Sequence, residues 1–338
     1  MKIGLFNGVS VFPGEDHRSV VERLVEQVRF ADSAGFWAQW IAERHFTPFT
    51  ASGAPSVLLG HLAAHTTRLR LGYAVALLSL YHPVRFAEEV AWVDTLSGGR
   101  TLVALGPGGS PQEYDAFGVP PTERRERFEE AFQIVRAALE GERFEWRGRF
   151  WTIPPIQIYP QPTRGRTFWL ACSSAEHVVW AASLDAIPLL GQRSNDEVRH
   201  QLAVYREARA ALGDDAATID GKVRQVGVIR RVMLGRSQAE ADDHVAQSQA
   251  AFQAAWRHVT GLAADADLPP PRYERADVIA GEAETVVHGL TELALTGVGH
   301  VVLAIGAGGL GVSNEVLRFN LETLAERVLP AVEAVAMA

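Results

Sequence analysis

One short segment, Glu43-Arg44-His45-Phe46, brings together a carboxylate, a guanidinium, an imidazole and an aromatic ring directly after an apolar run. The imidazole of His45 could exchange a proton during a reaction, because the unperturbed pKa of histidine lies close to neutrality. The same residues could instead form an ion pair and a structural histidine that close a strand. The segment alone leaves both interpretations open.

Two further segments place small polar residues directly after apolar runs. The backbone amides of Gly106-Pro107-Gly108-Gly109 could form an anion-binding turn, although Pro111 stands where a dinucleotide-binding G-x-G-x-x-G motif needs its third glycine. Ser173-Ser174 leads into a helical pattern that contains His177. The serine hydroxyls and the free N–H groups of that helix could hold a phosphate, or Ser174 could simply cap the helix.

Metal and lysine chemistry find little support. His61 and His65 are four residues apart on a predicted helix, but no third ligand accompanies them, so we expect no metal site. The chain has two lysines, Lys2 and Lys222, and we expect both at strand beginnings. The beginnings of the strands lie at the end of a barrel opposite to its active site. This position disfavours a mechanism with a Schiff base on either lysine.

The elements that must position these residues alternate between strand and helix along the whole chain. Eight strands are predicted, each followed by a helix, and their ranges are 2–7, 38–43, 69–78, 100–105, 167–173, 186–190, a part of 222–234, and 300–305. This count favours a (β/α)8 TIM barrel over a doubly wound sheet. We predict one α/β domain over 1–338, with a hairpin insertion after strand four at about 141–165 and a proline-rich loop after strand seven at about 261–281.

A barrel would bring the candidate residues together. The carboxyl ends of the strands form the active-site face of this fold, and the segments 43–46, 106–110 and 173–174 all follow predicted strands. We therefore expect one site at that face.

Composition narrows the classes of partner. The chain has 32 Lys and Arg against 40 Asp and Glu, a net charge of −8, and no basic stripe, which disfavours nucleic acid. No apolar run approaches the roughly 18 residues of a membrane span, and the first residues do not resemble a signal peptide. With a single cysteine, we expect a soluble cytoplasmic protein.

The helix predicted over 54–65 is apolar on more than one face, with Val57, Leu58 and Leu62 spread around it. An outer barrel helix normally has one apolar stripe. The second apolar face predicts a subunit interface, shared with the helix that carries Phe86 and Trp92, and hence a homodimer. The alternative is ordinary core with some exposed apolar side chains.

The segment AERHFT at 42–47 resembles the A-E-H-H-F-T segment of the bacterial luciferase-like, flavin-dependent monooxygenases. The further matches follow in the family's order, at 67–72 (TRLRLG), 82–85 (HPVR), 87–89 (AEE), 94–100 (DTLSGGR), 117–119 (FGV), 125–128 (RERF), 148–151 (GRFW) and 297–300 (GVGH). The resemblance is dense over about 1–190 and thinner beyond. It depends on the order and spacing of the motifs, since each alone is weak.

This resemblance implies a TIM barrel that dimerises through the helices after strands two and three. It also implies that reduced flavin, usually FMN, binds at the strand ends and reacts with O2 to oxygenate a small organic substrate such as an aldehyde. The chain contains no nicotinamide-binding motif, so a separate flavin reductase would supply the reduced FMN in a transient encounter.

The resemblance also implies roles for individual residues. The catalytic candidates are His45, Arg44 and Glu43. The cofactor-binding candidates are Ala74 and Val75, which match a non-prolyl cis peptide under the flavin ring, together with Gly106, and with Arg125, Ser173, Ser174 and His177 on the phosphate side. The substrate-pocket candidates are Phe6, Phe46, Phe49, Ser110 and Tyr114.

Two positions depart from the family pattern. Arg44 stands where many relatives have histidine, the catalytic base in luciferase itself, and an arginine cannot act as a base near neutral pH. Pro107 stands where many relatives have an arginine on the phosphate side. His45 would take over as base, and light emission is not implied. Two alternatives stay open, a flavin-binding relative with altered catalysis and a deazaflavin-dependent oxidoreductase.

Overall fold

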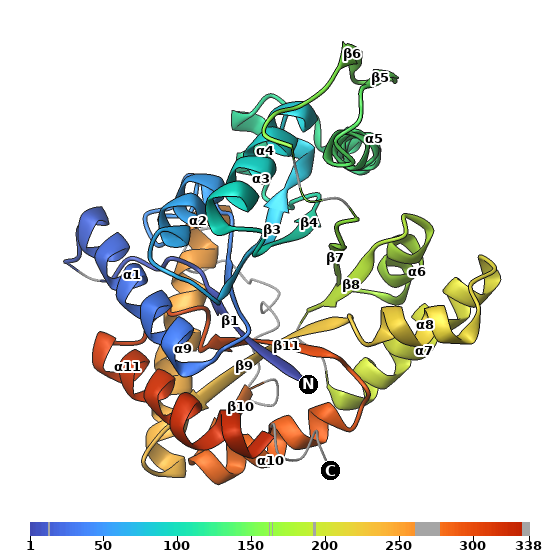
Figure 1. Cartoon of the computed structure of the whole chain (residues 1–338). Helices are drawn as coiled ribbons and strands as arrows, with labels where there is room; N and C mark the ends of the chain where they lie inside the picture. The colour runs from blue at the N-terminus through green and yellow to red at the C-terminus, as the bar shows by residue number, and fades with distance from the viewer. Residues whose placement is uncertain (13, 162, 164, 192–193, 261–277, 333–338) are drawn as a thin grey trace.

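The computed structural model describes residues 1–12, 14–161, 163, 165–191, 194–260 and 278–332. Its parallel strands form a closed ring with helices around the outside (Figure 1). In ring order the strands are β1 (Lys2–Asn7), β2 (Ala38–Ile41), β3 (Arg70–Leu77), β4 (Thr101–Gly106), β7 (Phe168–Cys172), β8 (Ile187–Leu190), β9 (Gly227–Leu234) and β11 (His300–Ile305). The predicted TIM barrel is confirmed.

The helices follow the strands in the expected alternation. They are α1 (His17–Ala34), α2 (Pro55–Ala63), α3 (Pro83–Ser97), α4 (Pro111–Ala116), α5 (Arg124–Leu139), α6 (Ala175–Ser183), α7 (Asn195–Ala211), α8 (Ala216–Val223), α9 (Gln238–Thr260), α10 (Ala283–Ala294) and α11 (Asn314–Thr323). Among the described residues, no helix combines the length and the apolar character that a membrane span requires.

Two predictions about the second half of the chain are wrong in part. Residues 278–281, expected in the proline-rich loop, form strand β10 (Val278–Gly281), which pairs with β9; residues 261–277 lie outside the described part of the chain. Lys222 lies in α8 rather than at the start of a strand. Four apolar residues after a proline-rich run are too few to separate a strand from a loop by pattern.

The ring closes through a short contact between β8 and β9. Only Leu189 and Leu190 of β8 pair with β9, opposite Gly227 and Val228, whereas β11 pairs with β9 along six residues. Since a strand has two edges, β8 and β10 follow one another along the same edge of β9. Among neighbouring strands of the barrel, β8 and β9 therefore share the fewest main-chain hydrogen bonds.

The predicted hairpin insertion is confirmed, and it projects away from the barrel (Figure 1). Strands β5 (Phe144–Arg147) and β6 (Thr152–Ile156) pair antiparallel. Glu130 of α5 holds the turn between them, because its carboxylate accepts the backbone N–H groups of Arg149, Phe150 and Trp151. One acidic side chain thus fastens the insertion to the helix layer.

Aromatic side chains fill the middle of the barrel. Trp40 of β2 is buried and lies opposite Gly72 of β3, where an added Cβ would come within 2.3 Å of its ring. Its ring also meets that of Trp169 edge-on at 5.8 Å between centroids. A filled middle leaves ligand space at the ends of the barrel, not through it.

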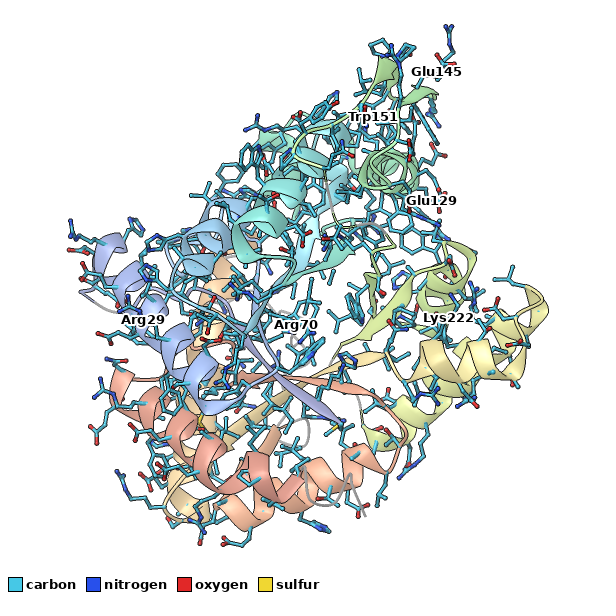
Figure 2. The ribbon with its side chains drawn as sticks, in the orientation of Figure 1. Arg29, Arg70, Glu129, Glu145, Trp151 and Lys222 are labelled. Carbon is cyan, nitrogen blue, oxygen red and sulfur yellow. The ribbon has the colours of Figure 1, made fainter. Side chains whose placement is uncertain are left out.

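Basic groups gather at the amino end of the strands. His300 is buried, and its ring meets that of Trp37 at 4.3 Å between centroids. Burial, followed by the charges of Lys2, the chain amine and Arg70, lowers the pKa of His300 to about 4. Figure 2 shows Arg70 near the centre of the ring. This end of the barrel holds neutral imidazole at physiological pH.

Candidate active site

A cavity of about 310 Å³ opens at the carboxyl end of the strands. Phe6 of β1, Ala42 after β2 and Ala307 after β11 belong to its lining, as does Gly191 after β8. Helix α9 closes one side with Phe252, Ala255 and Trp256. The cavity lies at the face where the sequence predicted a site and where barrels of this class bind their ligands.

Three predicted residues line this cavity: Arg44, Phe6 and Phe49. Arg44 is exposed at its edge, and among the described residues its guanidinium makes no ion pair. Its neighbour His45 is not among the lining residues, because consecutive side chains diverge in this turn. His45 points instead to Glu43, with 2.8 Å between Nε2 and Oε1.

Glu43 is a buried carboxylate whose two oxygens have different partners. Oε1 lies against His45, and Oε2 accepts the backbone N–H of Leu77 at 3.0 Å. Leu77 ends β3 just after the pairing with β4 shifts register between Ala74 and Ala76. The peptide bond between Ala74 and Val75 is cis, as the resemblance implies. Glu43 thus holds the end of the irregular stretch of β3 against the turn after β2.

The turn after β2 is packed by aromatic rings. The ring of His45 meets those of Phe46 and Phe117 at 5.6 and 4.9 Å between centroids. Phe46 has a positive φ of 55° and an exposed side chain, and it does not line the cavity. The backbone N–H of His45 donates to Glu113 of α4 at 3.0 Å. These contacts hold the turn in which Arg44 faces the cavity and His45 faces Glu43 and the aromatic rings.

The loop after β4 packs against the irregular part of β3. An added Cβ at Gly106 would come within 2.8 Å of a methyl group of Val75, so only glycine fits this approach. Tyr114 is buried, and its hydroxyl donates to the carbonyl of Pro107. Ser110 is also buried, and its hydroxyl has no hydrogen-bond partner among the described residues. The predicted pocket residues Ser110 and Tyr114 therefore lie behind the loop rather than on the cavity wall.

The predicted phosphate-side residues lie together where β7 meets α6. Ser174 caps α6 by accepting the backbone N–H of His177, and the hydroxyl of Ser173 lies 2.9 Å from Nδ1 of His177. Arg125 of α5 pairs with Glu176 in the first turn of α6, at 2.9 Å. Hydroxyls, an imidazole and free helix N–H groups suit an anion, although Arg125 is shared with a carboxylate.

The sequence did not identify the other half of the cavity wall. Ile229 and Arg231 of β9 point inward, and Phe252 and Trp256 face the cavity from α9. Two signals were available, the alternation of inward positions along a strand and the four-residue spacing of two aromatic residues on one helix. Neither says which helix folds back over the strand ends.

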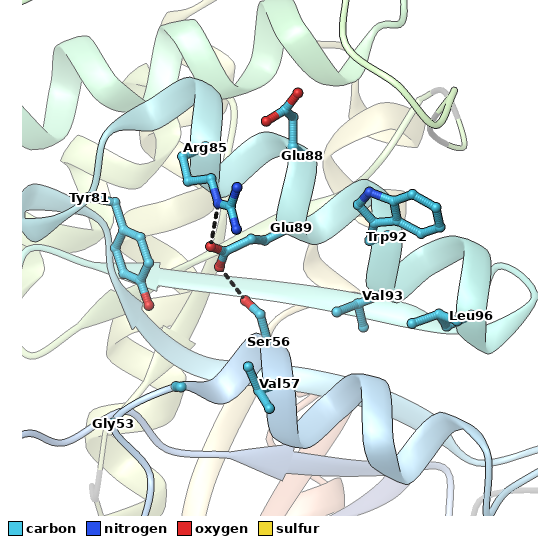
Figure 3. A pocket seen from close by; sticks show the side chains of 11 residues that line it. Gly53, Ser56, Val57, Tyr81, Arg85, Glu88, Glu89, Trp92, Val93 and Leu96 are labelled. Atoms are coloured by element: carbon cyan, nitrogen blue, oxygen red, sulfur yellow. Dashed lines mark hydrogen bonds and ion pairs between the residues drawn. The ribbon is translucent and has the colours of Figure 1, made fainter.

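A second hollow, of about 480 Å³, lies on the outside of the barrel between α2 and α3 (Figure 3). Glu89 accepts from Ser56 at 2.8 Å and pairs with Arg85 at 3.1 Å on its floor. Val57, Trp92 and Leu96 are exposed around it. It is separate from the strand ends. Within the described ranges, no group of three or more His, Cys, Asp and Glu side chains could hold a metal ion.

Comparison with known proteins agrees with this architecture. The model of a family described as luciferase-like monooxygenase matches residues 1–300. Protein y4wF of Sinorhizobium fredii is 32% identical over 233 residues, 67% of this chain and 66% of the relative. The alkanal monooxygenase alpha chain of the Kryptophanaron alfredi symbiont is 29% identical over 223 residues, 65% of this chain and 62% of the relative. Each match spans slightly less than two thirds of the relative's own length.

Solved structures share the fold over nearly the full chain. Monooxygenase RslO1 from Streptomyces bottropensis is 22% identical with a TM-score of 0.84, covering 98% of this chain and 99% of that one. The oxygenating constituent of 3,6-diketocamphane monooxygenase from Pseudomonas putida, in complex with FMN, has 18% identity, a TM-score of 0.77 and 98% coverage of both chains. An F420-dependent secondary alcohol dehydrogenase has 17% identity, a TM-score of 0.76 and 98% coverage of both chains. With the family match over residues 1–300, the chain belongs to the luciferase-like monooxygenase family.

Proposed function

We propose that this protein is a flavin-dependent monooxygenase that uses reduced FMN from a separate flavin reductase, together with O2, to oxygenate a small organic substrate. One observation carries the proposal, the position of an anion-binding cluster beside an apolar cavity. Gly191 lines the cavity and donates its N–H to the carbonyl of Cys172 at 3.1 Å, and Ser173 of the cluster is the next residue. An FMN held by its phosphate at this cluster would bring its ring next to the cavity, in which the substrate would bind.

The residues present suit FMN at both ends. Ser173, Ser174 and His177, with the N–H groups of the first turn of α6, would hold the phosphate. Ala74, Val75 and Gly106 would face the ring system, and Ser110 has a buried hydroxyl that lacks a partner among the described residues. Pro107 supplies no charge, so Arg125 would carry the ionic part of phosphate binding while Glu176 competes for it.

Reduced FMN, when bound, supplies the electrons that activate O2. The chain supplies the surroundings. The aromatic wall of Phe6, Phe49, Phe252 and Trp256 keeps water from the reacting groups. Glu43 holds the end of β3 and fixes the imidazole of His45 through a contact with Nε2. His45 therefore acts in this proposal as a positioning residue next to the site rather than as a base inside the cavity.

The test starts with anaerobic titration of the protein with reduced FMN, followed by O2 uptake with a panel of aldehydes and ketones. We expect saturable FMN binding, weakened in Ser173→Ala and His177→Gln, and uptake that increases with at least one substrate. Absence of FMN binding at tens of micromolar would refute the proposal. FMN binding without substrate-dependent uptake would favour the flavin-binding relative with altered catalysis.

A deazaflavin-dependent oxidoreductase is the second candidate. One observation favours it, the fold shared with an F420-dependent dehydrogenase. The two candidates differ in their need for oxygen. Tighter binding of F420 than of FMN, with substrate turnover under anaerobic conditions, would decide for this candidate.

We also propose that two copies of the chain associate through α2 and α3. Val57, Trp92 and Leu96 expose 71, 54 and 57% of their surface on these helices, around the hollow of Figure 3. Large apolar side chains gathered on one face normally mark an interaction surface. A second copy of the chain has the same apolar rim and the same polar floor on its α2 and α3. The two identical surfaces can therefore pack against each other across a two-fold axis.

A further inference from the structure

The lining of the active-site cavity has an uneven charge. Arg44 and Arg231 belong to it, but within the described ranges it contains no Asp, Glu or Lys. The chain as a whole has more acidic than basic residues, with a net charge of −8. A guanidinium remains protonated at any physiological pH. Within the described ranges, the charged side chains of this lining are therefore both positive, and the uncharged ones are mostly apolar.

Arg44 is the more available of the two. Its side chain is exposed at the cavity edge, and no ion pair to it is formed by the residues that the structure describes. Arg231 comes from β9, and its guanidinium lies 5.5 Å from the centre of the Phe252 ring, which it helps to hold. Thr50, also in the lining, has a hydroxyl without a hydrogen-bond partner among the described residues.

The remaining wall defines the body of the ligand. Phe6, Phe49, Phe252, Trp256 and Leu310 supply aromatic and aliphatic surface. A cavity of about 310 Å³ matches the lower end of small-molecule sites. A multiply charged phosphate would lose much hydration in such surroundings, whereas a single carboxylate can pair with an arginine fork while its apolar part contacts the rings.

We propose that the substrate of this cavity is a hydrophobic carboxylic acid, bound as the carboxylate, and that Arg44 selects it. This inference rests on the proposed function for the statement that the ligand is a substrate, but the binding itself requires no cofactor. Arginine in place of the histidine common in relatives then changes which substrate is chosen, instead of only removing a base.

The test uses the full chain without flavin and measures binding by calorimetry. The probes are carboxylates from phenylacetate and 4-phenylbutanoate to decanoate, each with its neutral amide. We expect at least one acid to bind about tenfold or more tightly than its amide, because a charge-assisted pair adds to the apolar contacts that both share. Equal binding, a preference for the amides, or no binding of any probe at millimolar concentration would overturn the inference.

Variants assign the preference to Arg44. Arg44→Gln should remove the preference for the acid and leave amide affinity unchanged, while Arg44→Lys should retain part of it, since lysine keeps the charge but not the fork. Arg206→Gln is the matched control, because Arg206 pairs with Asp220 on the outside and does not line the cavity. An unchanged preference in Arg44→Gln would overturn the assignment to Arg44.

Repeating the acid and amide titrations beside an anaerobic titration with reduced FMN separates the two proposals. Acid binding that depends on Arg44, with no binding of FMN, would leave this inference standing and refute the cofactor. FMN binding with equal affinities for acid and amide would support the cofactor and refute the carboxylate inference. If Arg44→Gln lowers the affinity for FMN and leaves the preference for the acid unchanged, Arg44 binds the cofactor and the inference fails.

Discussion

Glu43 shows how one buried side chain can support a whole site. Its two oxygens bind the Leu77 N–H and the His45 imidazole, so it joins the end of β3 to the turn after β2. A charged acceptor forms stronger hydrogen bonds than a neutral one. The position of the end of β3 relative to this turn therefore depends on this carboxylate.

Glu43→Gln keeps the shape of the side chain and removes its charge. We expect the free energy of unfolding to fall by about 1–2 kcal/mol, measured by urea denaturation, because hydrogen bonds to a charged group become neutral ones. Glu22→Gln, at an exposed ion pair with Arg18, is the control and should change stability by less than about 0.5 kcal/mol. Equal effects of the two variants would contradict the supporting role of Glu43.

His300 predicts a dependence of stability on pH. Its pKa is lowered to about 4 in the folded chain, against about 6.5 when unfolded. Between these values the unfolded chain binds the extra proton, so stability rises as pH rises from 4 to 6.5 and falls as pH falls through that window. We expect a contribution of about 2–3 kcal/mol across it.

The measurement compares urea denaturation of the wild type and of His300→Gln from pH 4 to 7. The variant loses ring contacts with Trp37 and is expected to be less stable at every pH. The informative quantity is the slope with pH, which should be shallower in the variant. Identical slopes would show that His300 does not titrate in this window.

The candidate site could be located from its residues, but the direction of each side chain could not. That Arg44 and Ser173 lie at strand ends followed from the apolar runs before them. Which of Arg44 and His45 faces the cavity depends on the turn around Phe46. Phe46 has a left-handed φ, and no local sequence pattern predicts it. Tyr114 is turned inward by a hydrogen bond to the Pro107 carbonyl, a contact set by the tertiary fold.

At the scale of elements, two glycines make room for one tryptophan. Trp40 lies between β1 and β3, close to Gly4 on one side and Gly72 on the other. Neither glycine needs a positive φ, so the requirement is space rather than backbone freedom. The neighbouring strands can approach only because they lack side chains at these positions.

Gly72→Ala should destabilise the barrel by about 1–3 kcal/mol, because the new methyl group would lie 2.3 Å from the Trp40 ring and force it to move. The matched control is Gly221→Ala in α8, where an added Cβ meets nothing within 4 Å. That change should be neutral or stabilising, since alanine favours a helix over glycine. Thermal unfolding of both variants measures the difference, and a neutral Gly72→Ala would refute the packing argument.

The order of elements was predictable because strand and helix periodicities differ and alternate regularly. The exceptions are short. Strand β10 has four residues. Helix α8 has eight residues and was not predicted, and its last two fall in the range 222–234 that was expected to contain the seventh strand. The wall contributed by α9 was missed for another reason, since the contact of Phe252 with the strand ends joins distant parts of the chain.

At the scale of the whole molecule, the proposed association through α2 and α3 predicts a change of mass on substitution. Trp92→Glu combined with Val57→Glu would place charges in the contact, and we expect the wild-type dimer to become a monomer in sedimentation equilibrium. Leu295→Glu is the control, because Leu295 is equally exposed but follows α10. A wild type that is monomeric at tens of micromolar would refute the proposed dimer.

The short contact between β8 and β9 has a consequence for the motions of the barrel. Two register pairs join these strands, whereas β1 has five with β11 and four with β2. Separating β8 from β9 breaks the fewest main-chain hydrogen bonds between neighbouring strands. The local opening of lowest free energy should therefore occur between these two strands. The amide hydrogens of β8, although fully buried, should then exchange with deuterium before those of β1.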